Sequence, residues 1–394
     1  MNFAVLDSKV QGYIRQNEHT NIAQLILKGS PFAGITPAEI AQQIEARKKT
    51  KKKLPTWHTT KQIYFPPGLN LEQTSSEITA QYKASLVTGQ KLIDLTGGFG
   101  IDSFFFAEVL EHVTHVEQNE ELSKIAKHNF QQLSNKENTT FICGDSLNYL
   151  AKSSHHYDAI FIDPARRDEL GSKVFRLQDC EPDVLSHLKL LTEKSDLLLI
   201  KTAPLLDIQL GLKELGSVKE IHIVGVNNEV KELLWLIDKN TPQAPVKLIC
   251  KNFTKENIET FEAFIEEESK AKAEYSSPQQ FLYEPNATLL KAGFFQLLAE
   301  KLQLKKIAQH SHLYTSEKLI SFPGRSFKIL ETFPFSKKEM RSWSNKKANI
   351  TTRNFPISVE SIRKKFKIKD GGADYLFFTT TQEGEKIAIH TQKV

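Results

Sequence analysis

Short apolar runs alternate with amphipathic stretches through the middle of the chain, between residues 91 and 238. Compact apolar runs predict buried strands, and apolar residues that recur every third or fourth position predict helices. The strands expected from this pattern are residues 92–94, 112–116, 139–143, 157–162 and 196–201, and the helices lie near 101–110, 119–133 and 177–191. Strands that alternate with helices predict an α/β fold with a parallel sheet and right-handed crossovers.

The pattern changes towards the end of this region. The runs 220–226 and 232–237 are joined by Asn227-Asn228, a two-residue turn signal, and predict an antiparallel pair at the sheet edge. The run 245–253 fits another strand. Residues 254–275 are rich in glutamate and predict a surface helix or a linker.

The segment before the sheet, residues 1–88, has helical signals. Residues 36–39, Thr-Pro-Ala-Glu, form a capping box and predict a helix over about 37–48. The basic run 47–53 repels itself, and it fits an exposed or mobile linker as well as a contact with an RNA backbone. Residues 74–77, Thr-Ser-Ser-Glu, form a second capping box and predict a helix that ends near residue 87.

The last part of the chain predicts a separate small α/β unit. Asn286 is the expected cap of a helix over 287–301. After Pro323-Gly324 we expect, in order, a strand (327–333), a helix capped by Ser336, a strand (349–353), a helix (358–366) and two more strands.

A glycine-dense turn follows the first expected strand. Gly97, Gly98 and Gly100 allow positive φ angles and a close approach of the backbone to a ligand, and the next helix points free N–H groups at the same place. A dinucleotide fingerprint would have a third glycine where this chain has Ser103. The carboxylate of Asp94 suits a ligand with an ammonium group, such as S-adenosylmethionine.

Three more expected strands also end in acidic residues. Glu117 follows the second strand and could bind both hydroxyls of a ribose. Gly144-Asp145-Ser146 follows the third strand and offers a contact for an adenine amino group, and Asp163-Pro164 follows the fourth. Open α/β sheets bind ligands at the carboxyl ends of their strands, so these residues predict one site.

The stretches 94–100 (Asp-Leu-Thr-Gly-Gly-Phe-Gly), Glu117, 144–145 (Gly-Asp) and 163–166 (Asp-Pro-Ala-Arg) together resemble the successive motifs of class I S-adenosylmethionine-dependent methyltransferases. The nearest likeness is to bacterial members that end in a ferredoxin-like piece and a THUMP-like domain. Thr96 stands where many members have a first glycine, and Ala165 where amine methyltransferases have a second proline.

The resemblance implies a seven-stranded Rossmann-like sheet and four parts. These are an N-terminal helical region (1–88), a methyltransferase domain (89–275), a ferredoxin-like piece (276–323) and a THUMP-like domain (324–394). It also implies contacts of Gln73 and Ser75 with the cofactor, S-adenosylmethionine. The implied cofactor-binding residues are Asp94, Thr96, Gly97, Gly98, Gly100, Glu117, Asp145, Ser146 and Asp163, and the implied catalytic residues are Asp163, Pro164 and Arg166.

Residues in and after the last motif bear on the reaction mechanism and on substrate contacts. Uracil C5 methyltransferases need a cysteine nucleophile after the fifth strand, where this chain has Lys201-Thr-Ala-Pro204, so a thiol mechanism is not expected. Arg166 and Arg167 fit a phosphate contact and a salt bridge to Asp168 or Glu169 equally well.

Composition and charge locate the chain and its partners. The 394 residues contain no membrane-length apolar run or signal peptide, and the three cysteines fit reduced thiols, so we expect a cytoplasmic protein without a metal. Lys and Arg against Asp and Glu number 11 to 6 in 1–88, 21 to 31 in 89–275, and 20 to 10 in 276–394. Basic flanks around an acidic middle suit a phosphate-bearing polymer or a solvated basic surface. The resemblance to THUMP-like domains implies structured RNA as the partner, and with these charges we expect tRNA or rRNA.

Other functions fit the same sequence. The chain could be an RNA-binding factor whose methyltransferase domain is idle, or a methyltransferase of a small molecule or a protein. An oxidoreductase is disfavoured by Ser103 in place of the third glycine. His310 and His312 have no cysteine or acidic cluster near them in sequence, which favours two ordinary histidines over a metal site.

Overall fold

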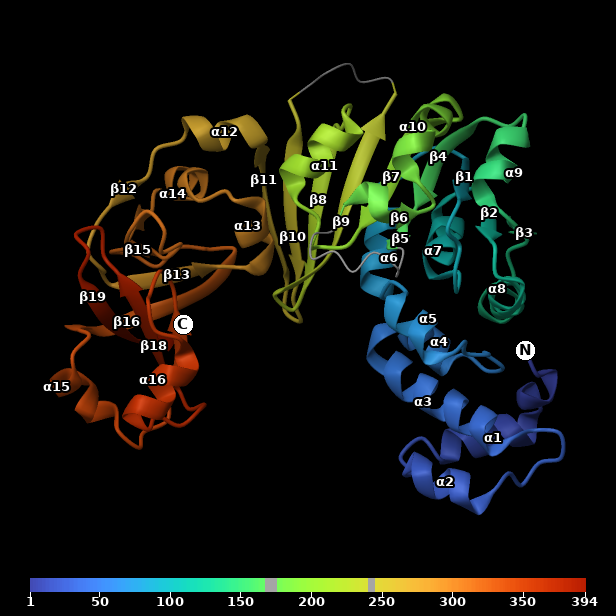
Figure 1. Ribbon diagram of the computed structural model, residues 1–394, viewed down its shortest axis with the longest axis horizontal. Helices are drawn as coiled ribbons and strands as arrows, with labels where there is room; N and C mark the ends of the chain where they lie inside the picture. Colours follow the sequence, from blue (N-terminus) through green and yellow to red (C-terminus); the bar gives the residue numbers. More distant parts are fainter. Residues whose placement is uncertain (167–175, 240–244) are drawn as a thin grey trace. The chain divides into compact units, whose positions relative to one another are not determined.

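The computed structural model describes residues 1–166, 176–239 and 245–394, and its chain divides into two compact units. Unit 1 contains Met1–Lys219 and Leu234–Ala244, and unit 2 contains Glu220–Leu233 and Pro245–Val394 (Figure 1). The four-part division expected from the sequence stays a prediction.

Unit 1 is built on parallel strands separated by helices, as the hydrophobic pattern predicted. The central strand β1 (Lys91–Asp94) pairs in parallel with β2 (His112–Glu117) and β4 (Tyr157–Ile162). Outside them, β3 (Thr139–Cys143) pairs with β2, and β7 (Ser195–Thr202) pairs with β4. The connecting helices are α7 (Ile101–Val109), α8 (Glu120–Leu133), α9 (Ser146–Lys152), α10 (Val184–Glu193) and α11 (Ile208–Leu215), and a short β5 (Ala165–Arg166), η3 (Leu177–Asp179) and β6 (Cys180–Glu181) precede α10.

The full sheet has the strand order β11-β10-β8-β9-β7-β4-β1-β2-β3. The predicted α/β sheet of the methyltransferase type is therefore confirmed, with two strands more than the expected seven. Asn227 and Asn228 both have positive φ, as a tight turn between β8 (Glu220–Val226) and β9 (Glu229–Asp238) requires. This pair does not form the edge, because β10 (Lys247–Phe253) adds in parallel to β8.

The expected helix or linker over 254–275 was wrong for its first half. Residues Ile258–Phe264 form strand β11, which pairs antiparallel with β10, and only Ile265–Lys270 form a helix, α12. Alternate residues of β11, Glu259, Phe261 and Ala263, are the less exposed ones, and Glu262 lies on the exposed face. The glutamate content hid this period of two, which marks a strand with one solvated face.

The N-terminal region consists of short helices: η1 (Phe3–Leu6), α1 (Ser8–Gln16), α2 (Ile22–Lys28), α3 (Pro37–Lys53), α4 (Pro55–Thr59), α5 (Gly68–Gln73) and α6 (Glu77–Ala84). The capping box of Thr36 and Glu39 is confirmed. The second box is wrong: Ser76 caps α6, and Glu77 instead accepts hydrogen bonds from Thr56.

The basic run 47–53 is not a linker, because helix α3 continues to Lys53. Arg47 is buried and forms an ion pair with Glu18 at 2.5 Å. Lys53 donates hydrogen bonds to the carbonyl oxygens of Leu71 and Glu72 at 2.9 and 3.0 Å. Tertiary partners thus offset the repulsion that the sequence alone suggested.

The N-terminal helices pack against the sheet's helices within unit 1. The buried indole of Trp57 contacts the ring of Phe104 in α7, with centroids 5.0 Å apart. The backbone of Tyr64 exchanges two hydrogen bonds of 2.9 Å with the side chain of the buried Asn129 in α8. This region is therefore part of the same compact unit as the glycine loop.

Unit 2 contains a second sheet of eight strands with the order β12-β14-β15-β13-β16-β19-β18-β17. The predicted helix over 287–301 is broken into α13 (Ala287–Ala292) and α14 (Gln296–Lys301), because Gly293 adopts φ 80° and ends the first. The strands are β12 (Glu274–Tyr275), β13 (Phe281–Pro285), β14 (Lys305–Lys306), β15 (Tyr314–Ser316), β16 (Gly324–Pro334), β17 (Asn349–Thr352), β18 (Asp374–Thr380) and β19 (Lys386–Lys393), and the last helices are α15 (Lys337–Met340), η4 (Arg341–Trp343) and α16 (Val359–Phe366).

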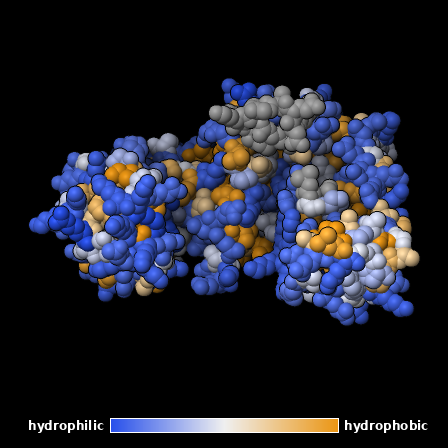
Figure 2. Space-filling model, turned by 60° about the horizontal axis from the view of Figure 1, so that its bottom comes forward, coloured by the Kyte–Doolittle hydropathy of each residue, from blue (hydrophilic) through white to orange (hydrophobic). Residues whose placement is uncertain are grey.

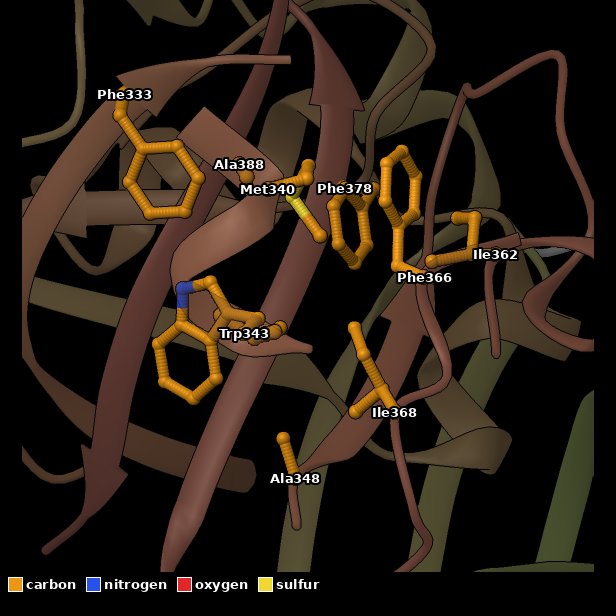
Figure 3. Packing of buried hydrophobic residues seen from close by; sticks show 10 residues of the cluster. Phe333, Met340, Trp343, Ala348, Ile362, Phe366, Ile368, Phe378 and Ala388 are labelled. Carbon is orange, nitrogen blue, oxygen red and sulfur yellow. The ribbon is translucent and has the colours of Figure 1, made fainter. Parts of the chain in front are cut away.

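The last part of unit 2 has its own apolar core, shown in Figure 3. Met340, Trp343 and Phe366 come from the helices, and Phe333, Phe378 and Ala388 come from strands β16, β18 and β19. Phe335 and Phe355 are partly buried and pack against this cluster. The aromatic residues among the basic residues of this part are thus core residues.

A buried carboxylate links strand β13 to its neighbour β16 and to the end of the more distant β17. Glu284 of β13 accepts hydrogen bonds from Arg325 of β16 and from Arg353, which follows β17. The Glu284 side chain is 3% exposed, and the arginines are 38% and 34% exposed. A carboxylate this deeply buried is stable only with such partners, so Glu284 holds β13, β16 and the end of β17 in fixed relative positions.

Candidate active site

The acidic residues expected at the site lie at one edge of the sheet. Strands β4, β1, β2 and β3 are neighbours and all run parallel, so their carboxyl ends meet at the same edge (Figure 1). Asp94 ends β1, Glu117 ends β2, and Asp163 follows β4. The fold brings together residues that are up to 69 positions apart in the sequence.

The glycine loop between β1 and α7 needs its glycines for two reasons. Gly98 and Gly100 have φ angles of 55° and 84°, where a side chain would be strained. A Cβ on Gly97 would overlap the imidazole ring of His115, and one on Gly100 would lie 2.8 Å from Phe130. Around the Cβ position of Gly98, the nearest atom is the carbonyl oxygen of Thr96 at 3.7 Å. The open side of the loop is therefore at Gly98.

A buried chain of hydrogen bonds supports this loop. The Asp94 carboxylate accepts a hydrogen bond from the N–H of Thr96 at 3.0 Å and another from the hydroxyl of Ser103. The same hydroxyl lies 3.0 Å from Nδ1 of His115. Asp94, Ser103 and His115 are all fully buried. Both Asp94 oxygens therefore bind within the protein, and its expected contact with a ligand ammonium stays a prediction.

Asp94 and His115 stand at the two ends of this chain of hydrogen bonds, and burial shifts their pKa values in opposite directions. Loss of hydration raises the pKa of Asp94 to about 7, because the charged carboxylate is disfavoured there despite the bond from Ser103. Burial lowers the pKa of His115 to about 3, so the imidazole is neutral at physiological pH.

Glu117 shapes the loop as well as ending its strand. One carboxylate oxygen accepts a hydrogen bond from the N–H of Gly98 at 2.8 Å, and the other accepts one from the N–H of Asn119 at 2.7 Å. Each carboxylate oxygen can accept a second bond. The geometry therefore leaves acceptor capacity for the two hydroxyls of a ribose next to the open side of the loop.

The third acidic tip is also a helix cap. Asp145 accepts a hydrogen bond from the N–H of Asn148 at 2.7 Å and caps α9, and Ser146 beside it is buried. Gly144 has φ 152° and no atom within 4 Å of its Cβ position. The backbone here is thus open to a neighbouring ligand.

Asp163 is connected to the glycine loop and to the neighbouring strand. Its N–H donates to the hydroxyl of Thr96 at 2.7 Å, and its carboxylate forms an ion pair with Lys201 at the end of β7. Pro164 is buried. The backbone of Arg166 ends the short strand β5, while Arg167, Asp168 and Glu169 lie outside the described residues.

Three residues of this edge were missed by the sequence analysis: Ser103, His115 and Lys201. Ser103 was noted only as a missing glycine, although its hydroxyl links Asp94 to His115. A signal existed for Lys201, because a lysine near the end of an otherwise apolar parallel strand needs a partner.

The helices before β1 meet the first turn of α7. Ser75 donates a hydrogen bond to Asp102 at 2.7 Å, and the fully buried Lys83 pairs with the same carboxylate at 3.1 Å. Ser75 thus reaches the element that follows the glycine loop, whereas Gln73 is exposed. Their direct contact with the cofactor stays a prediction.

With this geometry established, comparisons with known proteins identify the family. Residues 89–186 match a profile of RNA cap guanine-N2 methyltransferases, residues 281–323 a ferredoxin-like domain, and residues 324–393 a THUMP domain-like family. A crystal structure of a putative methyltransferase from Porphyromonas gingivalis W83 superposes with a TM-score of 0.90 at 34% identity, over 99% of this chain and 98% of that one. The chain belongs to this methyltransferase family.

A second relative is an uncharacterized RNA methyltransferase of Mycoplasma mobile. It is 33% identical over 131 residues, which are 32% of this methyltransferase and 35% of the relative. The match therefore spans about a third of the curated relative's length.

The family membership confirms the predicted enzyme class, and its cofactor is S-adenosylmethionine. The residues of this methyltransferase fit S-adenosylmethionine. The glycine loop is open at Gly98 and leads directly into α7, and Glu117 can accept further hydrogen bonds. Their individual assignment to the cofactor stays a prediction. When bound, S-adenosylmethionine supplies a methyl group already activated by its sulfonium.

Two further properties concern the described part of the chain. No helix in residues 1–166, 176–239 and 245–394 is long and apolar enough to cross a membrane. Within the same ranges, no three His, Cys, Asp or Glu side chains are grouped so that they could hold a metal ion. His312 stacks on Phe295 with ring centroids 3.7 Å apart.

Replacing the Glu117 carboxylate should weaken cofactor binding. In Glu117→Gln the charge is lost and one backbone donor near Gly98 loses its partner, so we expect a loss of roughly 1.5 to 3 kcal/mol. Calorimetry with S-adenosylhomocysteine measures it, with Glu121→Gln on the exposed side of α8 as the matched control. An unchanged affinity in Glu117→Gln would exclude Glu117 from the cofactor site.

The buried Asp94 and His115 should change the stability of the fold with pH in opposite directions. Its folded pKa of about 7 is above the unfolded value, so its contribution falls as the pH rises from about 4 to 7, by at most about 1.4 kcal/mol per pH unit. His115 has a depressed folded pKa, so its contribution rises with pH from about 3 to 6.5.

The two slopes therefore oppose each other in the wild-type protein between about pH 4 and 6.5. In Asp94→Asn only the His115 slope remains, so the unfolding midpoint should increase more steeply with pH than in the wild type. Urea unfolding at several pH values measures this, and parallel curves for the two proteins would contradict the assignment.

Proposed function

We propose that this methyltransferase transfers the methyl group of S-adenosylmethionine to a nucleotide in structured RNA, tRNA or rRNA. One observation supports the proposal most directly. The same chain contains a catalytic part similar to RNA cap guanine-N2 methyltransferases and a THUMP-like domain with a basic surface. The RNA methyltransferase of Mycoplasma mobile supports the same substrate class.

The site suits an acceptor nitrogen. Methyl transfer from a sulfonium is an in-line displacement, in which the protein mainly positions donor and acceptor. The lone pair of the acceptor nitrogen forms the new N–C bond as the C–S bond breaks and leaves its electrons on sulfur, and the surplus proton passes to water. Asp163 can accept a hydrogen bond from an exocyclic amine and stabilise the positive charge that develops on it, while Pro164 stiffens the turn.

A cysteine-dependent mechanism has no support at this edge. The fifth parallel strand, β7, ends in Lys201 and Thr202, followed by Ala203, and Lys201 is paired with Asp163. Of the three cysteines, Cys180 and Cys250 are buried, and burial raises the pKa of the Cys250 thiol to about 12. The exposed Cys143 ends β3, which lies three strands away from β4 and Asp163 in the sheet. A buried thiol is a poor nucleophile, which favours direct transfer to the acceptor.

The THUMP-like domain offers many unpaired cations to a phosphate backbone. On the face shown in Figure 2, hydrophilic residues cover most of the surface between separate apolar patches. Arg353 and Arg363 are engaged with Glu284 and Asp370. The exposed basic residues on and around α15, η4 and α16, none of which has an ion pair among the described residues, are Lys337, Lys338, Arg341, Lys346, Lys347, Lys364, Lys365, Lys367 and Lys369.

Labelled methyl transfer to RNA tests the proposal directly. RNA isolated from a strain without this gene lacks the modification, so the wild-type protein should label it and Asp163→Ala should reduce the label at least about 100-fold, as expected for a positioning group lost from the reacting centre. Mass mapping of the labelled RNA then names the base and the atom. Label on a protein or a small molecule, with none on RNA, would reject the RNA substrate.

The basic surface should give RNA binding a strong salt dependence. Each neutralised phosphate adds a log-log salt slope of somewhat under one, so Lys364→Glu, Lys365→Glu and Lys367→Glu together should flatten the slope and leave S-adenosylhomocysteine affinity unchanged. The same charge change at Lys127, Lys152 and Lys213, exposed lysines on helices of unit 1, is the control. An equal loss in both triple variants would assign the effect to net charge alone.

A further inference from the structure

Lys201 occupies a position that its own sequence context does not explain. It is the residue before the last in β7, a strand whose central residues Leu198, Leu199 and Ile200 are buried. Strand β7 runs parallel to β4 with Ile200 opposite Ile162, so the next residue of each, Lys201 and Asp163, face one another at the carboxyl edge. Their side chains form an ion pair through Nζ and Oδ2.

The pair is largely withdrawn from water. The Lys201 side chain is 14% exposed and that of Asp163 is 31% exposed. An ammonium this shielded costs free energy unless a carboxylate compensates it. The site must also accept a cationic methyl donor, so a lysine beside it is tolerable only when it is neutralised. Lys201 can lie here because Asp163 neutralises it, and its role at the site is exerted on that carboxylate.

The contacts of Asp163 show what that role can be. From the glycine-loop side, its backbone N–H is fixed by the hydroxyl of Thr96, whose own N–H is bound to Asp94. From the β7 side, Lys201 holds Oδ2. Among residues 1–166, 176–239 and 245–394, no group is hydrogen-bonded to Oδ1. The backbone and one oxygen of Asp163 are therefore fixed, and within the described part of the chain the other oxygen keeps its capacity to accept a hydrogen bond.

We propose that Lys201 is the positioning residue for the methyl acceptor: by holding one oxygen of Asp163, it aims the second at the N–H group of an exocyclic amine. This inference rests on the proposed function, since it concerns the acceptor of that reaction. Without the ammonium, the carboxylate is free to rotate about its side-chain bonds, and the acceptor amine loses its fixed hydrogen-bond partner. Small displacements of this kind reduce the rate of transfer more than they reduce binding.

The test replaces Lys201 and compares turnover with binding in the full-length enzyme. Lys201→Met keeps the length of the side chain and removes its charge, and we expect kcat for RNA methylation to fall 10- to 100-fold. The KM values for RNA and S-adenosylmethionine should stay within threefold of wild type. Lys201→Arg should restore turnover to within about fivefold, because a guanidinium also holds a carboxylate.

A matched control removes another lysine–aspartate pair from the same unit. Lys219 pairs with Asp238 at 2.9 Å, and the next residue, Lys239, is bonded to Asp196 near the start of β7. This pair therefore lies at the edge of the sheet opposite the site. Lys219→Met should leave kcat and both KM values within twofold of wild type, and thermal unfolding of both methionine variants separates lost stability from lost positioning.

Each other outcome is informative. A kcat in Lys201→Met equal to that of Lys219→Met would overturn the inference, and so would a raised RNA KM with unchanged kcat, which would make Lys201 a phosphate contact. A loss of turnover that Lys201→Arg does not restore, and that matches the fall in folded fraction, would make Lys201 structural. If the wild-type enzyme labels no RNA, the proposed function fails and the inference fails with it, whereas an active wild type with an equally active Lys201→Met rejects the inference alone.

Discussion

The imidazole of His115 fills the space next to Gly97, and this contact determines the path of the loop on which the site is built. The ring is held by Ser103, whose hydroxyl also binds Asp94, so a strand, a helix and a neighbouring strand are joined by one buried set of hydrogen bonds. Buried polar groups that are nearly all satisfied specify one arrangement, because any other leaves a donor or an acceptor without a partner.

The rest of the carboxyl edge is connected to this arrangement through the backbone. Thr96 binds Asp94 with its N–H and receives the N–H of Asp163 on its hydroxyl, while Gly98 donates to Glu117. The residues expected to meet the cofactor and the acceptor are therefore positioned by the same loop. This explains how a chain with serine at the third fingerprint position still has a rigid corner between β1 and α7.

The acidic and basic residues are concentrated in different parts of the chain, and each part suits a partner of opposite charge. Residues 89–275 carry more acidic than basic residues, as expected around a cationic methyl donor, and residues 276–394 carry twice as many basic as acidic residues. In unit 2 the two arginines that bind Glu284 are used to join the sheet, and the aromatic residues are used in the core. The exposed basic residues that remain on the THUMP-like part are lysines and Arg341, whose long charged side chains suit contacts with phosphates.

The sequence by itself determined the alternating parallel sheet, the glycine loop and the acidic strand ends, because hydrophobic period, glycine placement and strand order are local signals. It failed where neighbours in space overrode such signals. The lysine-rich end of α3 is held by Glu18 and by carbonyl oxygens of α5, the glutamates of β11 concealed a strand, and Gly293 divided an expected helix. Only the tertiary structure showed that His115 packs on Gly97 and that Lys201 holds Asp163. Each of these contacts joins one strand to the loop after a neighbouring strand, and which strands are neighbours is decided when the sheet is assembled.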